Sequence, residues 1–202
     1  MPKKKPWDYH VDLSPDRLQL LAKVLRDIRR DTLALHDPAG GDTSWSLGCR
    51  IYARSTALLV RASDQLWPWL KIVQGNLEFI FQVGAVPLRF FSGDAERPDI
   101  GHLRAVEAEV RQLEFAFGET RGDLVWRLVV ETDIAGEAGD IVLIGSDSKG
   151  DIRCAYPIPR LDDSISIFEP RRSAAKSGIE LPPPIVKSRR KAQQKDDDAG
   201  SV

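Results

Sequence analysis

The change of hydrophobic period along the chain constrains the fold most. Apolar residues recur every three or four positions up to about residue 66, and short β-branched and aromatic runs then follow, interrupted by one further helical stretch. The expected order is two helices, three strands, one helix and three strands, which indicates an α+β fold rather than alternating β and α units. We expect a mostly antiparallel sheet of five to six strands in two meanders, with three helices packed on one face and a disordered C-terminal tail.

The first helix has a clear beginning. Ser14 is placed as an N-cap, Pro15 occupies the first helical position, and Asp16 follows in the first turn. The helix would present one apolar face made of Leu18, Leu21, Leu25, Ile28, Thr32 and Leu35. Pro38, Gly40 and Gly41 make its continuation unfavourable.

Residues 43–66 fit two periods. Alternation of Trp45, Leu47, Cys49, Ile51 and Ala53 is typical of a strand, whereas Leu47, Ile51, Leu58, Ala62 and Leu66 are spaced as on a helix. The length of the stretch favours a helix capped by Thr43 or Ser44, and the strand stays open as the alternative. A third helix is predicted from Ile100 to Phe117, with Asp99 as its N-cap and Gly118 at its end.

The strands are expected at "WLKIV", "LEFIFQV" and "VPLRFF", and later at "LVWRLVVET", "DIVLIGS" and "IRCAYPI". In the central strands one face is apolar and the other is mixed. Ile80 and Val129 on the mixed face indicate that this face is partly covered, either by the chain itself or by a second subunit.

Charge divides the chain into three parts. Residues 1–7 carry +3 and residues 171–202 carry +4, so residues 8–170 carry −8 of the overall −1. We expect a basic N-terminal arm at 1–12, one globular domain at 13–168 and a Pro-rich, charged tail at 169–202. An acidic core repels phosphate, so nucleic acid would have to be bound by the basic tails or by a local patch.

The sequence also indicates the cellular compartment and the state of the two cysteines. No run of about 18 apolar residues is present, and no apolar segment follows the N-terminal lysines, so we expect an intracellular, cytoplasmic protein without a membrane partner. Cys49 and Cys154 are expected to be buried free thiols.

Few residues are arranged for catalysis. The sequence has no Gly-x-Ser-x-Gly elbow, only three histidines, and no Gly-rich loop that ends in Lys-Ser or Lys-Thr. We therefore expect no cofactor and favour a non-enzymatic protein.

One acidic loop provides an alternative. Four carboxylates within ten residues could supply oxygen ligands for a divalent cation, as in a metal-dependent hydrolase or nuclease: Glu131, Asp133, Glu137 and Asp140. The favoured interpretation is a solvated connection between two strands, because turns are rich in Asp, Glu and Gly.

Candidate binding residues lie in four places. Arg89 and Asp94 could form an ion-pair site at a strand end, although the favoured interpretation is that Gly93, Asp94, Pro98 and Asp99 supply turn and cap chemistry. Trp67 and Trp69 lie in a connection between elements; they could belong to an interface, although burial under the N-terminal helices is the favoured interpretation. Lys23, Arg26 and Arg30 form a basic stripe on the first helix, and Arg189, Arg190 and Lys191 form a basic cluster in the tail.

These observations favour a binding or adaptor protein. Its acidic core would dock a protein partner or self-associate, and its basic tails would contact a second, acidic partner, nucleic acid included.

Overall fold

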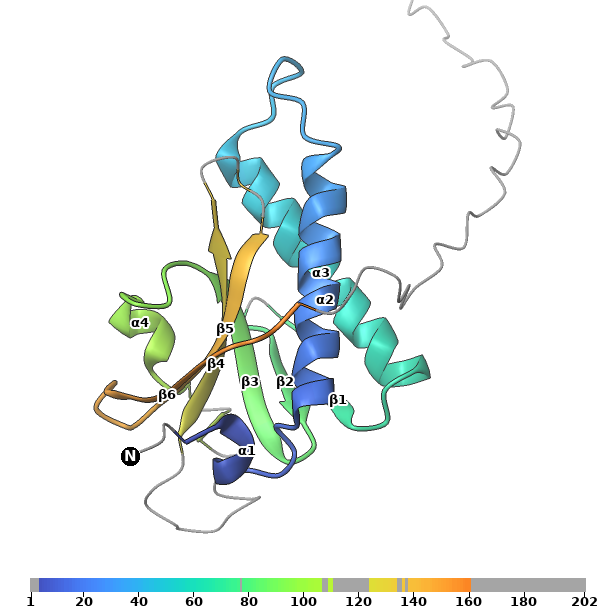
Figure 1. The fold of residues 1–202 in the computed structure, drawn as a ribbon. Coiled ribbons are helices and arrows are strands. Elements are labelled where there is room, and N and C mark those ends of the chain that lie inside the picture. Colours follow the sequence, from blue (N-terminus) through green and yellow to red (C-terminus); the bar gives the residue numbers. More distant parts are fainter. Residues whose placement is uncertain are drawn as a thin grey trace, which may run out of the picture. The chain divides into compact units, whose positions relative to one another are not determined.

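The protein is a six-stranded sheet with helices on both faces (Figure 1). The computed structural model describes residues 4–76, 78–106, 109–110, 124–133, 136 and 138–160. Its elements in chain order are α1 (Pro6–Tyr9), α2 (Pro15–Leu33), α3 (Ser44–Gln65), β1 (Leu70–Gln74), β2 (Ile80–Val83), β3 (Val86–Ser92), α4 (Ile100–Leu103), β4 (Val125–Thr132), β5 (Ala138–Ser146) and β6 (Ile152–Pro157). The predicted α+β class is confirmed, as are six strands in a mostly antiparallel sheet. The predicted disordered tail at 169–202 lies outside the described residues.

The strands follow one another across the sheet in chain order, from β1 to β6. Every neighbouring pair is antiparallel except β3 and β4, which run parallel, with Leu88 opposite Trp126 and Ser92 opposite Val130. Each half of the sheet is therefore a meander, as predicted. The long segment between Ser92 and Val125 joins the two halves, since parallel neighbours need a crossover.

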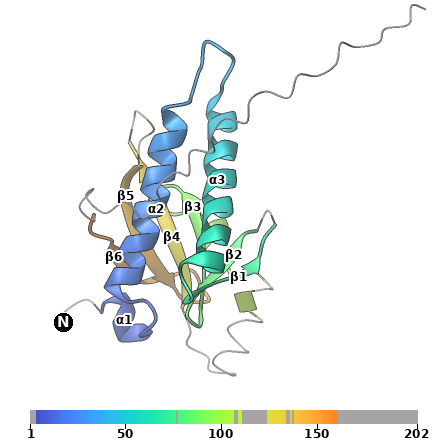
Figure 2. The ribbon, with the colours of Figure 1, turned by 90° about the vertical axis from the view of Figure 1, so that its right-hand side faces the viewer.

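Two long helices cover one face of the sheet. α2 and α3 lie side by side in Figure 2, with α3 over β1 and α2 over β5. The core fills the space between this helical layer and the sheet, and its fully buried members include Leu18, Leu21, Leu59, Phe81, Leu88, Leu128 and Leu143. Burial of these side chains provides most of the stabilisation of the layer.

The third helix is shorter than predicted and lies on the opposite face. Leu103 of α4 packs with Ala95 against Val129, Val142 and Ile144, so this face of the sheet is covered by the chain itself. The predicted helix from Ile100 to Phe117 begins where expected but is interrupted: α4 ends at Leu103, Arg104 is extended, with ψ 137°, and the chain is helical again at Glu109 and Val110. Residues 107–108 and 111–123 lie outside the described residues.

A buried arginine explains this early end. Arg127 on β4 donates from Nε to the His102 carbonyl at 2.6 Å and from Nη2 to the Arg104 carbonyl at 2.8 Å. In a continued helix these carbonyls would accept from backbone N–H groups one turn later. The Arg127 side chain takes that role, and the chain leaves the helical path at Arg104.

Local start signals were predicted well. α2 begins at Pro15 with Ser14 as its N-cap residue, although the Ser14 side chain makes no capping hydrogen bond. The ambiguous stretch is a helix, and its cap is Thr43: Thr43 Oγ1 accepts from the Ser46 backbone N–H, and Ser46 Oγ accepts from that of Thr43. Asp99 Oδ1 likewise accepts from the Gly101 N–H at the start of α4.

The N-terminal segment is packed onto the domain from Lys4 onward. In α1, Trp7 meets Tyr156 edge to face with ring centroids 5.2 Å apart, and Tyr9 meets Trp126 in the same way at 5.8 Å. The Tyr9 hydroxyl also donates to the carbonyl of Arg153 on the edge strand β6. The described part of the basic arm therefore covers one end of the sheet.

Candidate functional site

The outer face of α3 carries the most unusual surface of the described residues. Five exposed, uncharged side chains share this side of the helix with the exposed Asp64, facing away from α2 and β1, and we call these five the α3 face: Trp45, Cys49, Ala53, Ala57 and Val60. Trp45 is 78% exposed. Single exposed apolar residues are ordinary, whereas an aligned row headed by an exposed tryptophan is typical of an interaction surface.

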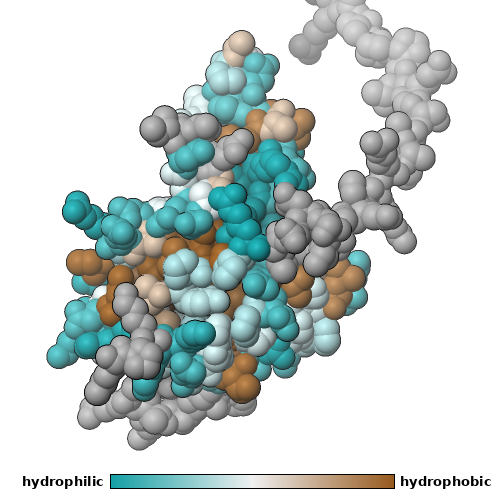
Figure 3. All heavy atoms as spheres, viewed as in Figure 1, coloured by the Kyte–Doolittle hydropathy of each residue, from teal (hydrophilic) through white to brown (hydrophobic). Residues whose placement is uncertain are grey.

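Further apolar side chains lie beyond the two ends of this row. Leu35 is exposed just after α2, close in sequence to the turn that leads into α3, and Leu66 is exposed just after α3. Figure 3 shows apolar (brown) atoms at the surface near both ends of the helical layer. Leu35 and Leu66 lie outside α3 and are not part of the α3 face.

Arginines follow one flank of the α3 face. Arg50, Arg54 and Arg61 lie on the same side of the helix, and Asp64, the one acidic residue of α3, lies one turn beyond Val60. Arg50 is neutralised by an ion pair with Asp42. Arg54 donates to Thr32 Oγ1 at 3.4 Å, and Arg61 is exposed and makes no ion pair with a described residue.

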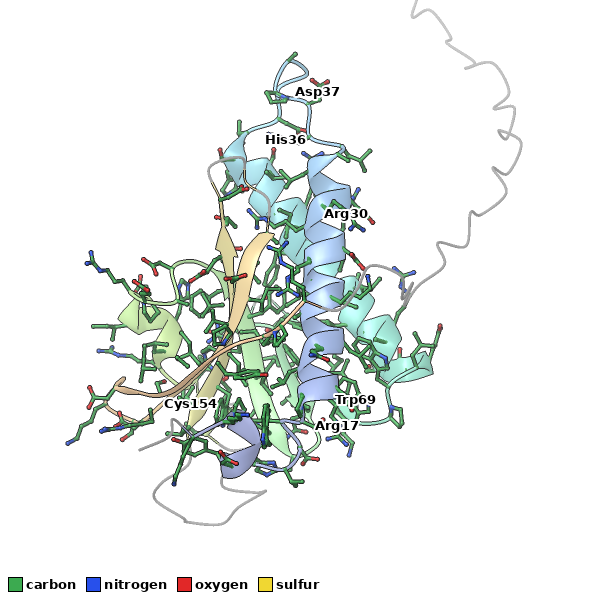
Figure 4. All side chains as sticks on the ribbon, viewed as in Figure 1. Arg17, Arg30, His36, Asp37, Trp69 and Cys154 are labelled. Atoms are coloured by element: carbon green, nitrogen blue, oxygen red, sulfur yellow. The ribbon has the colours of Figure 1, made fainter. Side chains whose placement is uncertain are left out.

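A compact turn fixes the start of α3. Asp42 accepts from the Asp37 backbone N–H at 2.8 Å and from the Arg50 guanidinium, and its carboxylate lies 3.4 Å from His36 Nδ1. The Asp37 N–H and then the Arg50 side chain hold the pKa of Asp42 below its usual value. Figure 4 shows His36 and Asp37 in this turn, beyond the end of the sheet. Trp45 therefore projects from a well-braced helix end.

The predicted basic stripe on α2 is held within the fold. Lys23 is only 7% exposed and pairs with Asp27 at 2.9 Å. Arg26 donates to the Ile158 carbonyl, and burial, followed by the charge of Arg160, lowers its pKa. Arg30 is 62% exposed, points away from the domain in Figure 4 and pairs with Asp27 at 3.0 Å. Of the three, only Arg30 is available to a partner.

Arg29 was not predicted as a special residue, yet it joins the two layers. It is buried, donates from Nε to the Gly136 carbonyl at 2.6 Å and lies 3.3 Å from Ser92 Oγ through Nη1. Burial lowers its pKa, and the nearby Asp133 opposes this effect. Its position beside Ile28 on the apolar face of α2 was the available signal.

Arg89 and Asp94 do not form one site. Asp94 Oδ1 accepts from the backbone N–H groups of Glu96 and Arg97, which is a turn. Arg89 is half-buried on β3, directly beside Arg127 in the parallel register, and no bond to Asp94 joins them. The turn accounts for both hydrogen bonds that the Asp94 side chain makes with described residues.

Trp67 and Trp69 are brought together at one corner of the domain. Their rings stack with centroids 5.0 Å apart and an interplanar angle of 14°, and Trp67 is buried. The Arg17 guanidinium lies 5.5 Å from the centre of the Trp69 ring, and Figure 4 shows the two side by side at the lower end of α2. Arg17 Nη1 also donates to Asp12 Oδ1 at 2.7 Å. The two rings therefore pack as part of the fold, and only the Trp69 ring is half-exposed.

The carboxylates of the alternative metal site have separate partners. Glu131 Oε1 accepts from the Ala95 backbone N–H at 3.1 Å on the α4 side of the sheet. Asp133 lies near Arg29, and Asp140 lies near Arg26, both on the α2 side. The described residues include no group of three or more His, Cys, Asp or Glu side chains able to hold a metal ion. Glu137 lies outside them, so the metal site stays a prediction.

The two thiols differ in environment. Cys154 is buried, as predicted, and burial raises its pKa to about 11. Cys49 is exposed on the α3 face, so the prediction of a buried thiol is wrong there. Both are free. The predicted tail contacts Arg189, Arg190 and Lys191 lie outside the described residues.

The comparisons with known proteins add no relative. No protein-family model, no curated protein and no solved structure matches this chain. Within the described residues, no helix is both long enough and apolar enough to cross a bilayer.

The α3 face was missed by the sequence analysis. The helical interpretation of residues 43–66 followed the apolar positions Leu47, Ile51 and Ala62, of which Ile51 and Ala62 are buried, and did not consider the opposite side of the helix. A signal was present, because the steps of four from Trp45 through Cys49 and Ala53 to Ala57 contain no charge on a face that would ordinarily be polar.

Proposed function

We propose that this chain is a non-enzymatic binding protein whose α+β core docks a protein partner through the α3 face, while its basic ends contact a second, acidic partner. The observation that supports the proposal is Trp45, 78% exposed at the head of an uncharged row on one side of a long helix. Tryptophan is enriched among the residues that dominate binding energy.

The bracing of the helix start supports the same function. The Thr43 and Ser46 capping contacts and the Asp42 to Arg50 ion pair hold the first turn of α3 in one conformation. A partner that contacts Trp45 then loses little additional conformational freedom from this chain on binding.

Site-specific cross-linking in the full chain tests this function. A photoreactive amino acid replaces Ala53, and a control places it at Ala155, which is exposed on β6. We expect a discrete adduct from position 53 in cells that express the protein, absent from position 155 and strongly reduced by Trp45→Ala. Ile100→Ala, which also truncates an exposed apolar side chain, should leave the adduct unchanged. Equal adducts at both positions, or insensitivity to Trp45→Ala, would contradict the proposal.

The second part concerns the tail. Its support is the charge of +4 on residues 171–202 against −8 on residues 8–170. Replacing Arg189, Arg190 and Lys191 with glutamine in the full chain should weaken binding to a 20-base-pair DNA duplex used as a polyanion probe, and should lower the salt dependence of the affinity. Binding that is unchanged by salt and by these substitutions would remove this part of the proposal.

A further inference from the structure

We infer that the partner segment at the α3 face is an acidic amphipathic helix. The inference rests on the proposed function and specifies the chemistry of its partner. It follows from the shape of the α3 face, from the charges beside it and from what those charges would do to a second copy of this chain.

The α3 face has the length and width to accommodate one partner helix. Trp45 and Val60 are 15 residues apart, which is about 22 Å along a helix, and the five side chains span about 120° of its circumference. Ala53 and Ala57 in the middle are small, so a partner helix can approach to the interaxial distance of about 8–10 Å found in packed helices. Trp45 and Val60 supply larger apolar contacts at the two ends.

A face of this length matches about four turns of a partner helix. Helix-in-groove recognition uses anchors at positions i, i+3 or i+4, and i+7, which is the spacing that a row of apolar residues on one helix presents to another. An extended peptide would instead need the unpaired backbone groups of a sheet edge, and the α3 face offers none.

The charges beside the α3 face indicate the sign of the charge on the partner. Arg54 and Arg61 are exposed along one flank, and Arg61 has no ion-pair partner among the described residues. Arg50 is neutralised by Asp42, and the one aspartate of α3, Asp64, is exposed one turn beyond Val60, in a core region whose net charge is −8. A local positive flank on an acidic surface favours acidic side chains placed beside the apolar row of the incoming helix.

The same charges disfavour a second copy of this chain. When two identical helices pair in antiparallel fashion, each flank adjoins the same flank of its partner. Arg54 and Arg61 would then face the arginines of the other copy, which is a like-charge contact at the edge of the interface. An acidic helix has no such repulsion.

Two labelled peptides test the partner class with the full chain. Both are 20-residue amphipathic helices with the same leucine face, and they differ only in carrying glutamate or lysine at the flanking positions. In fluorescence anisotropy at 50 mM salt we expect the glutamate peptide to bind at least tenfold more tightly than the lysine peptide. The difference should narrow at 300 mM salt, because screening weakens exposed ion pairs.

Matched variants locate the effect. The double variant Arg54→Glu with Arg61→Glu should reverse the preference between the peptides. The control Arg97→Glu with Lys149→Glu makes the same change in net charge at exposed positions away from α3 and should keep the original preference. Trp45→Ala should weaken binding of the glutamate peptide by roughly 30-fold, which corresponds to about 2 kcal/mol of binding free energy. Circular dichroism confirms that each variant is folded.

The outcomes separate this inference from the proposed function. Equal binding of both peptides, lost on Trp45→Ala, would overturn the acidic class and leave α3 as a docking surface. Absence of peptide binding together with a Trp45-dependent adduct at position 53 would overturn the helical partner alone. A concentration-dependent dimer in sedimentation that Ala53→Glu abolishes would make a second copy the occupant. Loss of both peptide binding and the adduct would remove the inference and the function together.

Discussion

Arg127 and Glu109 form a buried, two-pronged ion pair. Arg127 Nη1 lies 2.6 Å from Glu109 Oε1 and Nη2 lies 2.8 Å from Oε2, and both side chains are almost completely removed from solvent. The same guanidinium donates to the carbonyls of Trp126, His102 and Arg104, while Glu109 Oε2 accepts from the Val106 N–H. One side chain of β4 therefore holds the segment that follows α4 against the sheet.

Removing one partner of this ion pair should destabilise the folded protein. Glu109→Gln leaves the Arg127 charge buried without its counterion, so we expect a loss of about 3–5 kcal/mol in the free energy of unfolding, measured by urea denaturation. The double variant Arg127→Met with Glu109→Leu should recover part of that loss, because neither charge is then buried. A single variant within 1 kcal/mol of the native protein would show that the pair is hydrated in solution.

Gly84 should tolerate no side chain. Its φ is +62°, and a Cβ there would overlap the carboxylate of Asp12, which accepts from the Ala85 N–H and from Arg17. Gly84→Ala should therefore destabilise the protein by more than Gly41→Ala. Gly41 also has a positive φ, +100°, but the space around it is open, so only the backbone cost of about 1–2 kcal/mol is expected there. Equal losses in urea denaturation would contradict the role of Asp12.

Acid should weaken the fold below about pH 4. The pKa of Asp42 is lowered by the Asp37 N–H and by Arg50; that of Asp12 is lowered by the Ala85 N–H and by Arg17, which outweigh its partial burial. A carboxylate with a depressed pKa stabilises the fold above its unfolded value of 3.8, and this contribution is lost as the pH falls further. The urea midpoint should drop between pH 5 and 3. In the Asp12→Asn variant the urea midpoint should fall less over this pH range. A fall equal to that of the native protein would argue against a stabilising role of the Asp12 carboxylate.

The two cysteines should react at different rates. Cys49 is exposed, whereas Cys154 is buried beside the Lys4 carbonyl with its pKa raised to about 11. A thiol reagent at pH 7.5 should modify one cysteine quickly and the other only on unfolding, because the thiolate is the reactive form. Cys49→Ser should remove the fast phase. Protection of Cys49 by the glutamate peptide would report occupancy of the α3 face directly.

The alternative metal site has a thermal test. Since Glu131, Asp133 and Asp140 are engaged with different partners, we expect millimolar Mg²⁺ or Mn²⁺ to leave the melting temperature unchanged within about 1 °C. A clear rise that Asp133→Asn with Asp140→Asn abolishes would favour the hydrolase or nuclease alternative.

The sequence by itself determined the elements and most of their boundaries. Pro15 begins α2, Thr43 caps α3, Asp99 caps α4, and the six short runs are the six strands. These features depend on hydrogen bonds between residues two to four positions apart and on the period of apolar side chains, and both are readable locally. Asp94 belongs with them, because its turn is made by its own neighbours.

The tertiary structure alone decided which residues are buried, paired or left exposed. The parallel join of β3 and β4, the burial of Lys23 and Arg29, and the end of α4 at Leu103 all depend on contacts between distant parts of the chain. Arg127 meets Glu109 across 18 positions, and Arg29 reaches Gly136 across 107. The same packing covers one side of α3 with α2 and β1 and leaves Trp45 and Cys49 in solvent, whereas in a strand both would share a face with Ile51.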